Sequence, residues 1–135
     1  MHPVARWFTA YLVAAVVFGV LDALWITLVA LPTYEAEIPT LLGETINAPA
    51  GAAFYLLFLV GLVHFGVRPQ DRDAGLGSRV RDGALLGAVA YGTWGLTALA
   101  VIGGFSTLVA VTDLLWGAAA SAVVTLVTAL VLRPR

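Results

Sequence analysis

Four long stretches of apolar residues, separated by short polar segments, dominate the pattern along this chain. They cover about residues 7–31, 48–67, 83–102 and 107–132. A helix needs roughly 20 residues to cross the hydrocarbon core of a bilayer, so each stretch is long enough to span it. The pattern therefore predicts four transmembrane helices in one domain, residues 1–135.

Helix-breaking and helix-capping residues support these boundaries. All six prolines lie outside the four stretches or in a first turn, where a helix tolerates them. Asn47, Asp82 and either Ser106 or Thr107 come just before the second, third and fourth stretches, and we expect them to cap those helices. The predicted fold class is all-α, an integral membrane four-helix bundle.

Composition supports the same conclusion. The chain is 61% hydrophobic and 11% charged, whereas a typical soluble domain has about 25% charged residues. We expect the lipid bilayer to be its main partner. The net charge of −1 gives no attraction to nucleic acid, and we expect no nucleic-acid partner. The absence of cysteine excludes disulfides and thiolate chemistry.

The charged residues between the stretches predict the orientation. All seven arginines lie before the first stretch, between the second and third, or after the fourth: Arg6, Arg68, Arg72, Arg79, Arg81, Arg133 and Arg135. The remaining loops carry Glu35, Glu37 and Glu44, or no charge. Because positive charge collects on the cytoplasmic side, we expect both termini in the cytoplasm, an N-in/C-in topology.

Two aspartates lie inside the apolar stretches. Asp22 and Asp113 are each followed three residues later by a tryptophan, Trp25 or Trp116. A carboxylate at the bilayer centre costs roughly 2.5–3.5 kcal/mol on insertion scales, so it needs a structural or functional reason. At 1.5 Å per residue both aspartates lie roughly 10–13 Å from the outer helix ends. The first and fourth helices can thus bring them together, and we interpret the repeated motif as chance recurrence.

Three further polar or aromatic residues have a similar predicted depth: Tyr55 on the second helix and Trp94 and Thr97 on the third. Tyr91, also on the third helix, adds another ring. Binding pockets are mostly apolar with a few polar groups, so these residues, with the aspartates and their tryptophans, are the predicted ligand or proton site. The alternative is that the rings are core and interface aromatics.

Small residues recur at helical spacing and predict the packed faces. The stripes are Asp113, Gly117, Ser121 and Thr125 on the fourth helix, Gly87, Tyr91 and Gly95 on the third, and Ala15, Gly19 and Asp22 on the first. Small residues every four positions let membrane helices approach closely. We therefore expect the aspartates to face the bundle interior, and we expect the bundle to self-associate.

The sequence offers little other chemistry. It contains no metal-ligand cluster, nucleophile motif or phosphate-binding loop. His64 lies near the cytoplasmic end of the second helix, far from the aspartates, and we expect it to be interfacial. We therefore expect no metal and no cofactor, and the catalytic residues of any enzyme activity stay unassigned.

Four motifs in order carry a family resemblance: Leu21-Asp22-Ala23-Leu24-Trp25, Phe54-Tyr55-Leu56-Leu57, Ala90-Tyr91-Gly92-Thr93 and Thr112-Asp113-Leu114-Leu115-Trp116-Gly117. With them the chain resembles the bacterial four-span membrane protein family catalogued as domain of unknown function 2177. The resemblance implies a protein of the bacterial inner membrane, without an established activity, and favours a lipid-related role. The chain departs from the family pattern at Gly95 and Ala98, where the resemblance implies Asp and Asn.

Three functions remain open. The first is binding or transport of a small lipid-like or cationic molecule at the site around Asp22 and Asp113. The second is an enzyme, or an accessory subunit, in membrane-lipid modification, with the two carboxyls as general acid and base. The third is a structural scaffold in which the aspartates form a buried clasp. We favour the first, because intramembrane carboxylates are usually functional.

Overall fold

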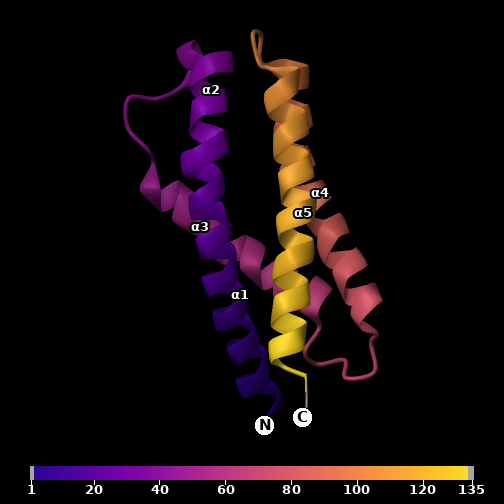
Figure 1. Ribbon diagram of the computed structural model, residues 1–135. Helices are drawn as coiled ribbons and strands as arrows, with labels where there is room; N and C mark the ends of the chain where they lie inside the picture. The colour runs from indigo at the N-terminus through magenta and orange to yellow at the C-terminus, as the bar shows by residue number, and fades with distance from the viewer. Residues whose placement is uncertain (1, 134–135) are drawn as a thin grey trace.

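The computed structural model describes residues 2–133, and these residues form helices and short connections without a strand (Figure 1). The elements are α1 (Pro3–Trp25), the π-helical η1 (Ile26–Ala30), α2 (Leu31–Glu37), the 3₁₀ turn η2 (Pro39–Leu41), α3 (Ala48–Gly61), the π-helical η3 (Leu62–Val67), α4 (Leu76–Val101) and α5 (Thr107–Val131). This confirms the all-α fold class.

Four helical stretches in the described chain are long and apolar enough to cross a membrane: Pro3–Glu37, Ala48–Val67, Leu76–Val101 and Thr107–Val131. The number of spans agrees with the sequence prediction. The first stretch is longer than predicted, because the helix continues through Pro32. Proline cannot donate a backbone hydrogen bond, and the π-helical turn η1 just before it allows the chain to stay helical.

The third helix also begins earlier than predicted. Helix α4 starts at Leu76, so the expected N-cap role of Asp82 is wrong. Asp82 lies within the second turn, where its carboxylate accepts from Arg68 at 2.6 Å and from Arg81 at 3.1 Å. The first turns of α4 carry arginines and are not apolar. A prediction from apolar stretches alone therefore begins the helix too late.

The other two predicted caps, Asn47 and Ser106, are confirmed. The Asn47 side chain accepts the backbone N–H of Ala50 at 3.2 Å, and the Ser106 hydroxyl accepts that of Val109 at 3.2 Å. Each satisfies one of the N–H groups that a helix start leaves without an intrahelical partner.

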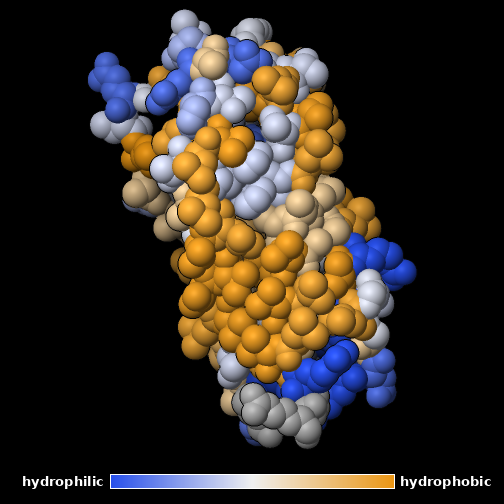
Figure 2. Space-filling view, in the orientation of Figure 1, coloured by the Kyte–Doolittle hydropathy of each residue, from blue (hydrophilic) through white to orange (hydrophobic). Residues whose placement is uncertain are grey.

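The first turn of α1 and the last turn of α5 lie at the same end of the molecule, whereas α2 and the α4–α5 turn lie at the other (Figure 1). On the face that Figure 2 shows, hydrophobic side chains form a band around the middle, with hydrophilic surface toward the ends. The described arginines gather at the end that holds the termini, as the predicted orientation requires. Arg135 lies outside the described residues.

Helix α1 packs with only part of the predicted face, since Asp22 is buried but Gly19 is not. Its buried residues are Ala10, Ala14, Phe18 and Asp22, whereas Gly19 is exposed with open space beside it. The Phe18 ring contacts the rings of α3, with centroids 5.6 Å from Tyr55 and 5.5 Å from Phe58. The large ring, not the small glycine, selects the packed face.

Helices α4 and α5 pack most closely, along the predicted small-residue stripes. A β-carbon added to Gly87 would overlap the backbone carbonyl of Gly117, and one added to Gly83 would overlap the Thr125 side chain. A β-carbon added to Gly95 would lie 3.1 Å from the Ala110 backbone, a tight contact that is less severe than the other two. The absence of side chains therefore permits this backbone contact.

We expect Gly87→Ala to destabilise the bundle by about 1–3 kcal/mol, because the added methyl group forces α4 away from α5. Gly77→Ala, on the same helix, is the matched control, since a β-carbon there meets nothing within 4 Å. The measurement is unfolding of the purified protein in detergent micelles by sodium dodecyl sulfate, followed by circular dichroism. Equal stability of the two variants would contradict the close α4–α5 contact.

The N-in/C-in topology stays a prediction, and the lack of native cysteine makes it easy to test. In intact bacterial cells we expect a membrane-impermeant maleimide to label Glu44→Cys and to leave Asp73→Cys unlabelled until the membrane is opened. Both positions are exposed, so accessibility reports the side of the membrane. The reverse labelling pattern would overturn the orientation.

Candidate functional site

A cavity of about 360 Å³ lies in the half of the bundle that contains α2. All five α-helices contribute to its wall. The lining residues are Asp22, Trp25, Ile26, Ala30, Leu31, Tyr34, Phe54, Tyr55, Ala90, Tyr91, Trp94 and Asp113. The structure thus brings both predicted aspartates to one cavity, although 90 residues separate them in sequence.

Asp22 joins three helices. It is only 5% exposed, and its Oδ2 accepts a short hydrogen bond from the Tyr55 hydroxyl on α3. Its Oδ1 accepts the indole N–H of Trp116 on α5 at 3.1 Å. Both donors are neutral, so the carboxyl is hydrogen-bonded without an opposing charge.

Asp113 is also 5% exposed, and its partner is a residue that the sequence analysis missed. Its Oδ2 accepts a short hydrogen bond from the Tyr34 hydroxyl. The apolar pattern placed Tyr34 in the loop after Pro32, but the continued helix carries it over the cavity. The Ser106 hydroxyl donates to Glu37 Oε1 at 2.9 Å and ties the end of α2 to the start of α5.

The two Asp-x-x-Trp motifs meet in space. The rings of Trp25 and Trp116 stack with centroids 4.5 Å apart and planes inclined by 4°. Trp116 also donates to Asp22, the aspartate of the other motif. Chance recurrence remains our interpretation of the sequence repeat, but the two copies form one connected structure.

The other predicted site residues take different positions. Trp94 and Tyr91 line the cavity, and Trp116 binds Asp22 beside it. Thr97 does not line the cavity; it is exposed, and its hydroxyl donates back to the Thr93 carbonyl of its own helix. His64 lies in η3, edge-on to Phe65 with ring centroids 4.8 Å apart, and it is also absent from the lining.

The charged groups that line this cavity, which we call the aspartate cavity, are all acidic. Two carboxyls line it, and no arginine or histidine is among its lining residues. Residues 2–133 contain no group of three or more His, Cys, Asp or Glu side chains arranged to hold a metal ion. The arrangement can hold one or two protons, or a cation that takes the place of a proton.

The sequence matches a family described as predicted membrane protein, DUF2177, over residues 7–130. The chain belongs to this family. That DUF2177 assignment confirms the resemblance seen in the four motifs and agrees with the four apolar helices. Searches of curated proteins and of solved structures give no match to the chain.

The two positions where the chain departs from the expected family pattern lie outside the cavity. Gly95 packs against Ala110, and Ala98 is 3% exposed. Neither residue is part of the lining. The departures therefore leave the lining of the aspartate cavity intact.

We expect Tyr34→Phe and Tyr55→Phe each to lower the stability of the bundle by about 0.6–1.7 kcal/mol, the range for hydrogen bonds between membrane helices. Tyr91→Phe is the matched control, because the Tyr91 hydroxyl lines the same cavity without a hydrogen-bond partner in residues 2–133. Unfolding in detergent provides the measurement. A loss for Tyr91→Phe as large as for the other two would contradict the assigned bonds.

Proposed function

We propose that this DUF2177 protein binds a small amphiphilic cation in the aspartate cavity and exchanges it for protons. The observation that carries this proposal is the pair of carboxyls, Asp22 and Asp113, in an aromatic cavity whose lining contains no basic side chain. The proposal includes the bacterial inner membrane as the location, as the family resemblance implies.

Charge is the first support. A buried carboxylate without a cation is costly in hydrocarbon surroundings. The donors at Asp22 and Asp113 are neutral tyrosine and tryptophan groups, which satisfy hydrogen bonds and leave the negative charge uncompensated. A positively charged ligand compensates it, and so does a proton.

The aromatic lining is the second support. Ammonium groups are attracted to aromatic faces within about 6 Å of the ring centroid, most strongly to tryptophan. Trp25, Trp94 and Tyr91 supply such rings beside the carboxyls. The volume of about 360 Å³ suits a small molecule, and the surrounding hydrocarbon suits an apolar tail.

Exchange follows from competition for the same oxygens. When the cation enters, a carboxyl proton leaves; when the cation departs, a proton returns. Charge in the cavity then stays balanced at each stage, which avoids the cost of an empty ionised site. Cation affinity is therefore expected to rise with pH.

A structural clasp is the second candidate, and the hydrogen bonds favour it specifically. Asp22 connects α1 to α3 and α5, and Asp113 connects α5 to α2. Such bonds hold the bundle together whether or not a ligand enters. The lipid-modifying enzyme stays an untested prediction; it requires both carboxyls to reach one reacting bond.

The decisive test measures binding of octyltrimethylammonium to the protein in a non-ionic detergent, by quenching of tryptophan fluorescence and by calorimetry. We expect Asp22→Asn and Asp113→Asn each to weaken binding at least about tenfold, because each removes a negative charge and keeps a polar side chain of similar size. Glu44→Gln is the matched control, an exposed carboxyl outside the cavity. Octanol controls for the apolar tail.

Transport is then measured in proteoliposomes, as proton release driven by a gradient of the same cation. Unchanged cation binding in both asparagine variants would reject the proposed site and leave the clasp as the role of the aspartates. Binding without coupled proton movement would reject exchange and retain a binding protein.

A further inference from the structure

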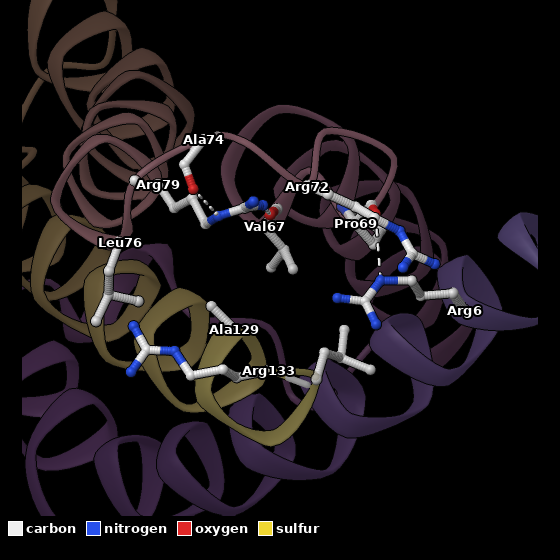
Figure 3. A pocket seen from close by; sticks show the side chains of 11 residues that line it. Arg6, Val67, Pro69, Arg72, Ala74, Leu76, Arg79, Ala129 and Arg133 are labelled. Atoms are coloured by element: carbon white, nitrogen blue, oxygen red, sulfur yellow. Dashed lines mark hydrogen bonds between the residues drawn. The ribbon is translucent and has the colours of Figure 1, made fainter. Parts of the chain in front are cut away.

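A second cavity lies at the opposite end of the bundle, and it has the opposite charge. Its volume is about 310 Å³, and it lies among the ends of α1, η3, α4 and α5 (Figure 3). We refer to it as the arginine cavity, because Arg6, Arg72, Arg79 and Arg133 line it. Its other lining residues are Val67, Pro69, Ala74, Gly75, Leu76, Ala129 and Leu132.

Arg79 builds the wall of this cavity. Its guanidinium donates to the backbone carbonyls of Ala74 at 3.1 Å and Arg68 at 2.7 Å, and also to those of Val67 and Asp71. These bonds fold the α3–α4 connection around the arginine. Arg79 is thus occupied by the protein, although its positive charge still faces the cavity.

The other three guanidiniums are less engaged. Arg6 donates through Nε to the Pro69 carbonyl at 3.3 Å, which leaves its terminal nitrogens available. No hydrogen bond or salt bridge within residues 2–133 engages the side chains of Arg72 and Arg133. In Figure 3, Arg6 and Arg72 lie on one side of the cavity and Arg133 on the opposite side.

The arginine cavity has no acidic residue in its lining, although Asp71 interacts electrostatically with Arg79 from the loop nearby. The only salt bridges in the described chain join Asp82 to Arg68 and Arg81, which do not line the cavity. In the nearby loop, the Asp71 carboxylate accepts the backbone N–H of Asp73 at 3.2 Å and is also not part of the lining.

We propose that the arginine cavity binds a phosphomonoester, the group that a phosphorylated lipid or a soluble phosphate ester presents. Guanidinium groups match phosphate oxygens with paired N–H donors, and they carry their charge at every physiological pH. A phosphomonoester carries a charge of about −2, so several arginines around one cavity suit it better than a phosphodiester, which carries a single negative charge. This site is independent of the cation proposal, because it shares no residue with the aspartate cavity.

Apolar residues beside the guanidiniums favour the lipid as the source. Val67, Leu76 and Leu132 line the same space. Val67 and Leu76 belong to helices that continue into the apolar band, and Leu132 directly follows α5. A phosphorylated lipid would place its headgroup against the arginines and its chains against that band. A soluble phosphate ester would use the arginines alone.

The experiment uses the full chain in a non-ionic detergent and measures dissociation constants by calorimetry. The probes are dioctanoyl phosphatidic acid, glycerol 3-phosphate and dioctanoyl phosphatidylcholine. We expect Arg72→Gln and Arg133→Gln each to weaken phosphatidic acid binding at least about tenfold, because each removes a charged donor to phosphate. Arg81→Gln is the matched control at the same end of the bundle; its side chain is 73% exposed and outside the cavity.

Each outcome decides the question. Tighter binding of phosphatidic acid than of glycerol 3-phosphate, lost in the two cavity variants and kept within twofold in Arg81→Gln, supports the proposal with a lipid ligand. Equal affinity for the two phosphomonoesters, with the same pattern among variants, supports it with a soluble ligand. Equal loss in all three variants, equal binding of phosphatidylcholine, or no binding overturns it.

Discussion

A carboxyl group surrounded by hydrocarbon must receive its hydrogen bonds from the protein, and this requirement determines how the helices meet around Asp22 and Asp113. Asp22 needs donors from α3 and α5, and Asp113 needs one from α2. The two tyrosine side chains that reach these carboxyls, Tyr34 and Tyr55, also form part of the cavity wall. The need of the two buried carboxyls for hydrogen-bond donors therefore accounts for the helix positions, the cavity shape and the charge in this half of the bundle.

The close contact of α4 and α5 complements this arrangement. At Gly87 and Gly95 the α4 backbone meets the α5 backbone, and at Gly83 it meets the Thr125 side chain, so little space remains between the two helices. Nearer the other helices, large rings such as Trp25 and Trp116 keep α1 and α5 farther apart. Cavity space lies on the side with rings and not on the side with glycines. Residue size thus determines where space remains inside the bundle.

The sequence predicted the four spans, two of the caps and the grouping of the aspartates, because each depends on local pattern or on depth along a helix. It missed Tyr34, since a proline normally ends an apolar helix and only the π-helical turn η1 carries the helix past it. It included Gly19 in the packed face of α1 because small residues suggest contact, whereas that position is exposed and the neighbouring Phe18 fills the core. The start of α4 was missed because charged turns lack a hydropathy signal.

The two cavities place opposite charges in different electrical surroundings. The carboxyls of the aspartate cavity lie among aromatic rings and are only 5% exposed, so their attraction for the proposed cation is weakly screened. The arginine cavity lies at a polar end, where charges more than about 8 Å apart are largely screened at physiological ionic strength. Only direct contacts between guanidinium and ligand oxygens then retain their strength. Affinity for the proposed phosphomonoester should therefore depend on which arginines touch it, whereas affinity for the proposed cation should depend on whether the two carboxyls are ionised.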